Sequence, residues 1–215
     1  MPKLQLAIDD LNYMDALKLM QQIQPYVDII ELGSPFIMEY GMEAVRNFRK
    51  QFPNNEILAD LKIMDAGYYE AELAFKAGAD YVTVLGVTDL LTIKGCQEAA
   101  NAYGKNIYVD MICVEDLLKR MKEVESIGVH GISVHIGIDQ QAAGKKPIDD
   151  LKIIVKHRTN TVVSVAGGIK SSTIPMYIAA KADVVIAGGG ICHCQNPTKE
   201  AELISKLLKE GKETL

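Results

Sequence analysis

Eight short apolar runs, each followed by a stretch with apolar residues at helical spacing, constrain the fold of this chain more than any other feature. The runs occupy residues 4–8, 27–32, 57–61, 81–85, 107–112, 131–135, 161–165 and 184–187. The stretches with helical spacing occupy residues 14–23, 42–52, 68–77, 89–103, 115–127, 148–156, 173–180 and 197–208. Continuous apolar strands that alternate with helices indicate a parallel sheet covered by helices.

Eight strand–helix units in 215 residues, without a linker or a low-complexity segment, predict an α/β fold with one (β/α)8 TIM barrel spanning residues 1–215. An open doubly wound sheet is the alternative architecture, but it normally has fewer strands. Gly78, Gly104 and Gly128 follow three of the expected helices and are typical helix C-caps. Residues 137–146, rich in glycine, glutamine and alanine, are expected to form a loop.

The composition excludes several classes of protein. The formal net charge is -5 and there is no basic block, which argues against nucleic acid as a partner. No apolar run is long enough to span a membrane, and the first residues lack a signal core, so we expect a cytoplasmic protein. Four scattered cysteines predict reduced thiols. The segment Cys192-His193-Cys194 has no second ligand pair at metal spacing, so a zinc site is not favoured.

The segment Asp60-Leu61-Lys62-Ile63-Met64-Asp65 closes the third apolar run. Asp60 and Lys62 are two residues apart, so on a strand their side chains point the same way. A carboxylate and an ammonium on one buried face are unfavourable unless they pair or serve a ligand. The segment is therefore either an internal ion pair followed by a turn aspartate, or part of a functional site.

Polar residues recur where the expected strands end. In a (β/α)8 barrel these ends form the catalytic face. Asp9 and Asp110, taken singly, are better explained as helix caps, because aspartate is a preferred N-cap residue. Six polar residues end the expected strands: Asp9, Glu31, Asp60, Lys62, Asp110 and His135. Because all six would lie on one face of the barrel, together they favour a functional site.

Glycine clusters follow the last two strands, at Gly167-Gly168 and Gly188-Gly189-Gly190. Loops after strands seven and eight commonly bind phosphate in this fold, although tight turns also use glycine. Glu31 and Asp60 offer the hard oxygen ligands that Mg²⁺ prefers. Lys62 would stabilise a developing enolate, and His135 is a candidate general acid or base. The pattern predicts a site for a phosphorylated sugar and a metal-stabilised enediolate.

The sequence resembles the orotidine 5′-phosphate decarboxylase suprafamily and, within it, the branch of 3-hexulose-6-phosphate synthases. The resemblance runs from about Leu4 to the last helix. The motifs that carry it are Ala7-Ile8-Asp9, Ile30-Glu31-Leu32-Gly33, the segment from Asp60 to Gly67, Val82-Thr83-Val84-Leu85-Gly86, the segment from Asp139 to Gly144, and Val165-Ala166-Gly167-Gly168-Ile169.

The resemblance implies a reversible, Mg²⁺-dependent aldol condensation of formaldehyde with D-ribulose 5-phosphate through a 1,2-enediolate, the reaction of the ribulose monophosphate pathway. Mn²⁺ is the alternative metal. It also implies a homodimer in which Asp65 reaches the partner's active site. The implied roles are metal binding by Glu31 and Asp60, enediolate stabilisation by Lys62, proton transfer by His135, contact with substrate hydroxyls by Asp9, and phosphate binding by Ala166, Gly167, Gly168, Gly188 and Gly189.

Three other functions compete with this expectation. The 3-keto-L-gulonate 6-phosphate decarboxylase branch shares the barrel and the Asp-Lys-Asp set, but typically has arginines where this chain has Ile138 and Gly189. A Schiff-base aldolase would use Lys62 as a nucleophile. A non-catalytic sugar-phosphate sensor would not need a metal pair beside a lysine. The chain also departs from the synthases at Ile136, where they often have threonine, and in residues 191–195.

Overall fold

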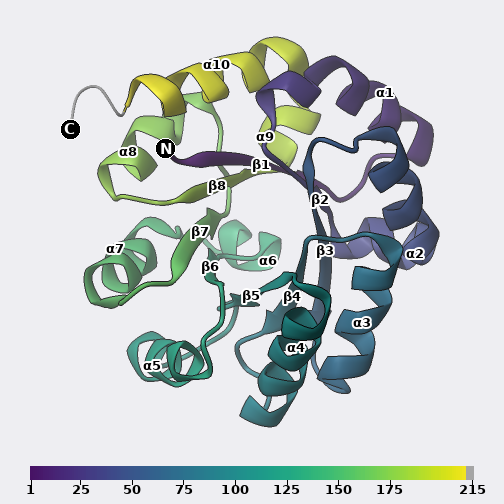
Figure 1. The fold of residues 1–215 in the computed structure, drawn as a ribbon. Helices are drawn as coiled ribbons and strands as arrows, with labels where there is room; N and C mark the ends of the chain where they lie inside the picture. The colour runs from purple at the N-terminus through teal and green to yellow at the C-terminus, as the bar shows by residue number, and fades with distance from the viewer. Residues whose placement is uncertain (212–215) are drawn as a thin grey trace.

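The expected strands close into a ring. The structure, a computed structural model, describes residues 1–211. Neighbouring strands are parallel throughout, and the eighth pairs with the first, so the predicted (β/α)8 barrel is confirmed (Figure 1). The strands are β1 (Lys3–Ile8), β2 (Ile29–Leu32), β3 (Glu56–Ile63), β4 (Tyr81–Leu85), β5 (Asn106–Asp110), β6 (Gly131–His135), β7 (Val162–Ala166) and β8 (Val184–Ala187).

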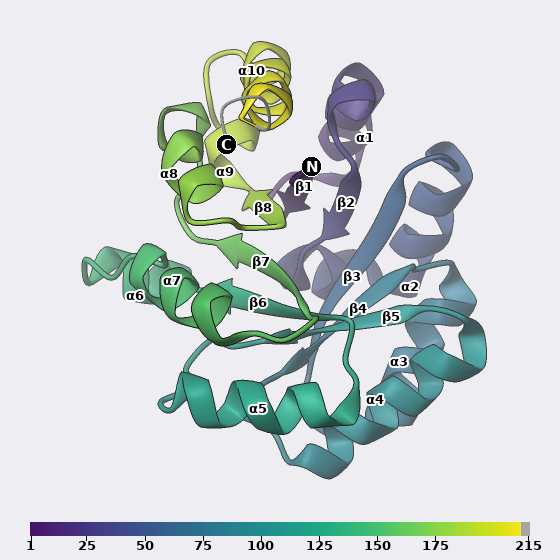
Figure 2. The same cartoon turned by 60° about the vertical axis from the view of Figure 1, so that its left-hand side comes forward.

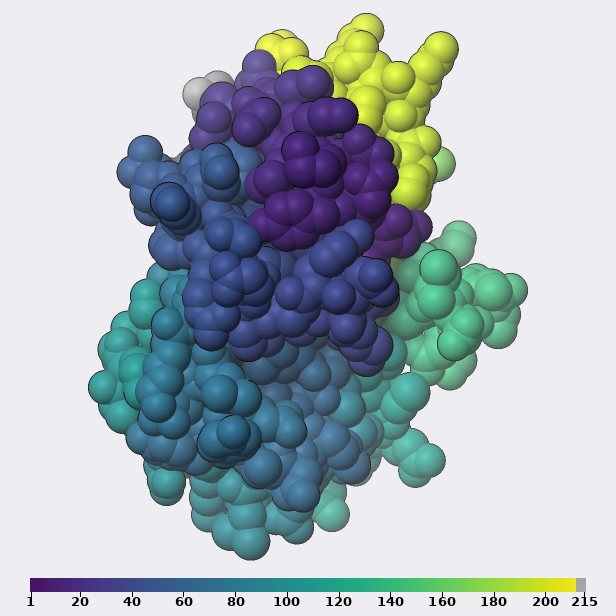
Figure 3. All heavy atoms as spheres, turned by 90° about the vertical axis from the view of Figure 1, so that its right-hand side faces the viewer, coloured from purple at the N-terminus to yellow at the C-terminus, as the bar shows by residue number. Residues whose placement is uncertain are grey.

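The longer helices form an outer layer around the strands (Figure 2). The helices are α1 (Tyr13–Ile23), α2 (Ser34–Gln51), α3 (Gly67–Ala77), α4 (Leu90–Tyr103), α5 (Leu117–Ile127), α6 (Ile138–Ala142), α7 (Ile148–His157), α8 (Ile174–Ala179), α9 (Gly189–Cys192) and α10 (Pro197–Glu210), with 3-10 turns η1 (Gln24–Tyr26) and η2 (Ser171–Thr173). The first helix lies beside the last, so this layer also closes (Figure 3). Within residues 1–211, no helix has the length and apolar character needed to span a lipid bilayer.

Both faces of the strands are buried, which explains their continuous apolar sequences. The larger core cluster lies between the strands and the helices. The smaller one lies inside the ring of strands and contains Ala7, Ile29, Leu58, Tyr81, Tyr108, Val184 and Ile186. Barrels of this kind have a packed interior and carry their sites at the end formed by the carboxyl termini of the strands.

Glycine closes three helices as predicted. Gly78, Gly104 and Gly128 have φ angles of 106°, 62° and 83°, and each backbone N–H bonds to a carbonyl of the preceding helix. This left-handed conformation is strained for residues with a Cβ atom. The last four residues of the predicted barrel domain, 212–215, lie outside the described part of the chain.

Two helical segments differ from the prediction. Helix α2 begins at Ser34 instead of residue 42, because Pro35 in its first turn favours helix initiation. Gly41, with φ 62°, kinks it and hides the periodicity of its first half. Residues 138–142, expected to be loop, form the short helix α6, whose first turn follows Gly137. This segment projects from the rim of the barrel (Figures 2 and 3).

Aspartates fasten the amino-terminal ends of the strands. Asp28, Asp80 and Asp183 each precede an even-numbered strand, and each pairs with one residue of the strand before it. The Asp80 carboxylate accepts the Ile57 N–H at 2.9 Å, while the Asp80 N–H donates to the Ile57 carbonyl at 2.7 Å. Asp28 does the same with Leu4, and Asp183 with Val163. We call these three residues the aspartate clamps.

We expect Asp80→Ala to lower the free energy of unfolding by about 2–4 kcal/mol. The substitution leaves the Ile57 N–H without its acceptor, and Arg49 and Lys105 without their shared carboxylate. Urea unfolding would measure the change. Glu43→Ala is the control, because it breaks only an exposed ion pair with Arg46, expected to contribute less than about 1 kcal/mol. Equal losses in the two variants would contradict a special role for the clamp.

Candidate active site

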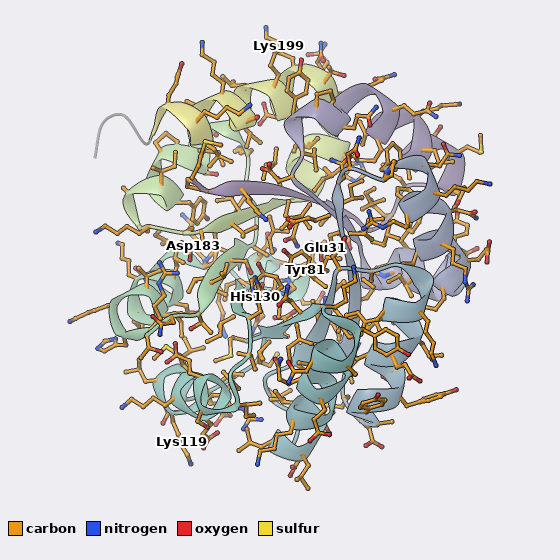
Figure 4. All side chains as sticks on the ribbon, viewed as in Figure 1. Glu31, Tyr81, Lys119, His130, Asp183 and Lys199 are labelled. Atoms are coloured by element: carbon orange, nitrogen blue, oxygen red, sulfur yellow. The ribbon has the colours of Figure 1, made fainter. Side chains whose placement is uncertain are left out.

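A cavity of about 300 Å³ opens at the carboxyl ends of the strands. Every residue predicted for the site except Asp65 lines it: Asp9, Glu31, Asp60, Lys62, His135, Ala166, Gly167, Gly168, Gly188 and Gly189. Figure 4 shows Glu31 inside the ring of strands, whereas Lys119 and Lys199 lie on the outer helices. The barrel thus brings together residues that are separated by most of the chain.

Asp60 and Lys62 meet in an ion pair at the end of β3. The expectation that strand alternation would align them is only partly correct, because the strand is irregular here. Lys62 has φ 47°, and the pairing with β4 shifts register between Ala59 and Ile63. The Lys62 N–H leaves the regular ladder and donates to Thr83 Oγ1 at 2.9 Å. This bulge, typical of barrel rims, turns the lysine into the cavity.

Asp60 is 3% exposed and is held by several donors. Thr83 Oγ1 donates to it at 2.6 Å, Ser34 Oγ at 2.9 Å, and the Lys62 ammonium contacts it directly. Burial alone would raise the pKa of this carboxyl, but Lys62 and the two hydroxyls outweigh burial and hold the pKa below its ordinary value. Asp60 is therefore ionised at neutral pH.

Lys62 remains a cation. Burial alone would lower its pKa, but Asp60 and Asp110 raise it above the ordinary lysine value. The Asp110 carboxylate lies 3.8 Å from its Nζ atom. The lysine can therefore donate hydrogen bonds and stabilise negative charge, but it is not a free amine.

Glu31 is a second buried carboxyl group beside Asp60. It is 8% exposed, and Gln5 Nε2 donates to it at 2.7 Å. Burial, followed by repulsion from Asp60, raises its pKa to about 8. A divalent cation would relieve this repulsion, and carboxylate oxygens suit Mg²⁺. Residues 1–211 contain no group of three His, Cys, Asp or Glu side chains placed to hold a metal. The residues thus fit a metal bound by two carboxylates, with substrate or water as the remaining ligands.

His135 and Asp110 form a second polar pair, on adjacent strands β6 and β5. His135 Nδ1 lies 2.8 Å from Asp110 Oδ2, and the other carboxylate oxygen accepts the Ile112 N–H at 2.9 Å. Burial alone would lower the histidine pKa, but the bond to Asp110 outweighs it and raises the pKa above 6.5. The contact orients the ring, so His135 can take or give a proton from its other nitrogen.

Asp110 lies at the end of β5 and does not cap a helix. The N-cap of α5 is Asp116, which accepts from Lys119 N, so the cap interpretation of Asp110 taken alone is wrong and its interpretation as a site residue is favoured. Asp110 is 3% exposed and lies between His135 and Lys62. Two features of the sequence identify Asp110 as a site residue. It lies at the end of one expected strand, and His135 lies at the end of the next.

Asp9 also faces the cavity and does not cap a helix. The N-cap of α1 is Asn12, whose side chain accepts from Asp15 N. Burial, and then repulsion by Asp60, raise the pKa of Asp9. A Cβ atom on Gly33 would collide with the Asp9 carboxylate, so the glycine after β2 makes room for this side chain. Asp9 is thus placed to contact a polar ligand.

The two glycine loops meet at one side of the cavity mouth. Gly167 and Gly168 have φ angles of 130° and 66°, which favour glycine. Gly190 packs so closely on the Ile169 carbonyl that a Cβ atom there would clash. The second cluster begins the short helix α9, which the sequence did not predict because glycine is a poor helix former. Glycine-rich loops of this kind can present backbone N–H groups to an anion such as phosphate.

Two predicted features lie apart from this cavity. Asp65 is exposed and accepts only the N–H of the next residue, at 2.7 Å, within residues 1–211. His193, of the Cys192-His193-Cys194 segment, bonds to Asp10 at 2.9 Å, and Cys192 lies against the Ala7 carbonyl. Burial raises the pKa of the Cys192 thiol to about 12, so it is a poor metal ligand at neutral pH.

A closed barrel whose strand ends gather acid–base groups, next to two glycine loops, defines a TIM-barrel enzyme with an anionic substrate. The chain belongs to the orotidine 5′-phosphate decarboxylase / HUMPS family, whose profile matches residues 2–204. The relationship predicted from the sequence motifs is therefore confirmed, and the relatives described next place the chain among the aldehyde-lyases of this family.

Relatives with close similarity are named 3-hexulose-6-phosphate synthase. The protein from Methylomonas aminofaciens is 46% identical over 95% of this chain and 98% of its own length. The crystal structure of the Salmonella typhimurium synthase is 49% identical, covers 97% of this chain and 99% of its own, and has a TM-score of 0.95. The 3-keto-L-gulonate-6-phosphate decarboxylase structure from Vibrio cholerae is 26% identical, covers 97% of this chain and 98% of its own, and has a TM-score of 0.85.

We expect Asp110→Asn to lower the pKa of His135, because the neutral amide no longer stabilises the imidazolium. NMR titration of the histidine ring protons would measure the change. Asp10→Asn is the matched control, since it alters an aspartate bonded to His193 and leaves His135 untouched. An unchanged His135 titration in Asp110→Asn would show that the carboxylate does not govern the proton affinity of this ring.

Proposed function

We propose that the protein is a 3-hexulose-6-phosphate synthase, which condenses formaldehyde with D-ribulose 5-phosphate to give D-arabino-hex-3-ulose 6-phosphate, reversibly. The observation that carries the proposal is the continuous polar chain Asp60–Lys62–Asp110–His135 at the cavity wall. It combines a fixed cation with an oriented acid–base group, as enediolate chemistry requires. The names and the identities of the relatives support the same reaction.

Each residue of the site has a separate role in the condensation. The glycine loops bind the phosphate through backbone N–H groups, and Asp9 accepts hydrogen bonds from sugar hydroxyls. His135 removes the proton from C1, and the Lys62 ammonium stabilises the negative charge that develops on the enediolate oxygen. The C1 carbanion centre then attacks the formaldehyde carbon. The formaldehyde oxygen receives the electron pair of the broken π bond and takes the proton that His135 carries, so the reaction needs no other acid or base.

Glu31 and Asp60 would hold Mg²⁺ or Mn²⁺. Two carboxylates of which one has a raised pKa, with one neighbouring ammonium, fit such an ion. When bound, it supplies further electrostatic stabilisation to the enediolate oxygens. The Gln5 side chain donates a hydrogen bond to the Glu31 carboxyl group, and the Thr83 and Ser34 hydroxyls donate to the Asp60 carboxylate, so both groups are fixed in place.

Features of the site weigh against the competing functions. A Schiff-base lysine must lose its proton, whereas Lys62 is paired with two carboxylates that raise its pKa. Decarboxylases of the family typically have arginine at the positions of Ile138 and Gly189. Ile138 is the first residue of α6, is 81% exposed and lines the cavity mouth, so no guanidinium is available there. A pure sensor would not need an oriented His–Asp pair.

We propose that the protein is a homodimer with shared active sites. Exposed apolar side chains gather on and beside α3 and α4, in the part of the chain that contains Asp65. They are Met64, Tyr68, Tyr69, Leu73, Val87 and Leu91. An apolar surface of this kind favours association, and Asp65 at its edge would then reach the partner's cavity. The cytoplasmic location expected from the sequence stays a prediction.

We expect wild-type protein to consume formaldehyde with ribulose 5-phosphate in a chelator-sensitive reaction, and Asp60→Ala to reduce the rate at least about 100-fold. The variant loses the partner that fixes Lys62 and one of the two metal carboxylates. Circular dichroism would verify the fold. Asp89→Ala, which removes an exposed helix cap, is the control for activity. Chelator-insensitive turnover, or normal turnover in Asp60→Ala, would contradict the metal assignment.

We expect Ile138→Arg to increase carbon dioxide release from 3-keto-L-gulonate 6-phosphate, because a guanidinium at the cavity mouth can orient a proton-donating water. The position is exposed, so the fold should tolerate the change. Ile138→Lys should give a smaller gain, since it lacks the planar fork of donors. No gain with arginine would show that this position does not separate the two activities.

A further inference from the structure

The segment that carries Asp65 has an unusual backbone. Lys62 and Ala66 have φ angles of 47° and 50°, in the left-handed region that residues with a Cβ atom rarely adopt. Asp65 lies between them, is exposed, and does not line the cavity of its own barrel. Strained conformations of this kind persist only where the surrounding structure holds them. The contacts of residues 62–66 therefore determine the direction in which Asp65 projects.

Strand β4 and the turn after it, residues 86–88, hold this segment at two points. Thr83 Oγ1 accepts the Lys62 N–H at 2.9 Å, and Thr88 Oγ1 donates to the Met64 carbonyl at 2.6 Å. Thr88 is 4% exposed. The Met64 carbonyl belongs to the planar peptide group that leads into Asp65. The Thr88 hydroxyl thus fixes the plane from which this aspartate projects.

Arg120, on α5, holds the turn that contains Thr88. Its guanidinium donates to the Gly86 and Thr88 carbonyls, and it also pairs with Glu123 at 2.9 Å. The arginine side chain is 15% exposed. Hydrogen bonds from a charged donor are stronger than neutral ones, and the rigid guanidinium holds two carbonyls at a fixed separation. The turn is also bonded to the active site, because the Gly86 N–H donates to the Asp110 carbonyl at 2.7 Å.

We propose that Thr88 and Arg120 are positioning residues that orient Asp65 toward the active site of a partner subunit. The inference rests on the proposed synthase function with its shared sites, and adds the residues that hold the shared aspartate in place. Arg120 fixes the turn, and the Thr88 hydroxyl fixes the Met64 carbonyl. Because the turn is also bonded to the main chain of Asp110, one rigid connection joins the acid–base pair of each barrel to the aspartate that it supplies to its partner.

Thr88→Val tests the positioning role. Valine keeps the size and branching of threonine but cannot donate to the Met64 carbonyl. We expect kcat/KM for ribulose 5-phosphate to fall about tenfold, because small misplacements of groups at a site can cost as much as about 100-fold. Thr88→Ser keeps the hydroxyl and should restore activity to within about twofold of the wild type. Thr161→Val, at a buried threonine bonded to Glu125 at the amino-terminal end of the barrel, is the matched control and should leave kcat/KM unchanged.

Arg120→Gln should reproduce the loss seen in Thr88→Val, because it removes the guanidinium that fixes the turn. Glu123→Gln is its control. That substitution removes only the ion pair at the outer side of the guanidinium and leaves both carbonyl contacts, so it should not change kcat/KM. A loss in Glu123→Gln equal to that in Arg120→Gln would contradict a role for the carbonyl contacts.

A double-mutant cycle with Asp65→Ala separates orientation from general stability. In the Asp65→Ala background, Thr88→Val should change kcat/KM less than about twofold, because the aspartate that it orients is absent. Exchange of the substrate C1 proton with deuterated water, accumulated over hours and followed by NMR, measures even weak activity in this background. Losses that multiply in the double variant, or an equal loss in Thr161→Val, would overturn the positioning role.

Sedimentation and the formaldehyde assay distinguish failure of this inference from failure of the proposed function. All variants are assayed at concentrations at which the wild type sediments as a dimer. If the wild type condenses formaldehyde as a dimer but Thr88→Val and Asp65→Ala act independently, only the positioning role is overturned. A monomeric wild type, or normal turnover in Asp65→Ala, overturns the shared site and the positioning role. Absence of condensation in the wild type overturns the proposed function and this inference with it.

Discussion

The ion pair between Asp60 and Lys62 is the interaction on which the site depends. Four acidic side chains, Asp9, Glu31, Asp60 and Asp110, line one cavity with a single lysine among them. Glu31, Asp60 and Asp110 are buried, and buried carboxyl groups are unfavourable unless they have partners. Lys62 contacts Asp60 and lies near Asp110, so one ammonium stabilises two of them. The left-handed backbone at Lys62 places the ammonium there, so an irregularity in β3 determines the electrostatics of the whole site.

The architecture could be predicted because the eight apolar runs specify it by number and order. The errors occurred where short-range signals conflict. Gly41 and Pro35 interrupt the apolar pattern of α2, yet one kinks a helix and the other begins it. Helices α6 and α9 are too short for periodicity to show, and both begin at glycine-rich segments that are typical of loops. Tertiary contacts, which one sequence does not display, decide such segments.

Most of the candidate site could be predicted from the barrel architecture, because a barrel brings the carboxyl ends of its strands together on one face. Asp110 taken singly is ambiguous because aspartate at a strand end serves equally well as a cap, and only the contact with His135 distinguishes the roles. The bulge at Lys62 could not be predicted from alternation. Gln5, which donates to Glu31, was also missed, because it lies singly within an apolar strand and gives no local signal.

The aspartate clamps at the opposite end of the barrel have a consequence for how the ring opens. They fasten β1 to β2, β3 to β4, and β7 to β8, so local unfolding should separate these two-strand units from one another before it divides any of them. One boundary between units runs between β2 and β3. Glu31 lies on one side of this boundary and Asp60 on the other. A cation shared by these two carboxylates would tie adjacent folding units together, so that loading the site with metal would also make the barrel unfold more cooperatively.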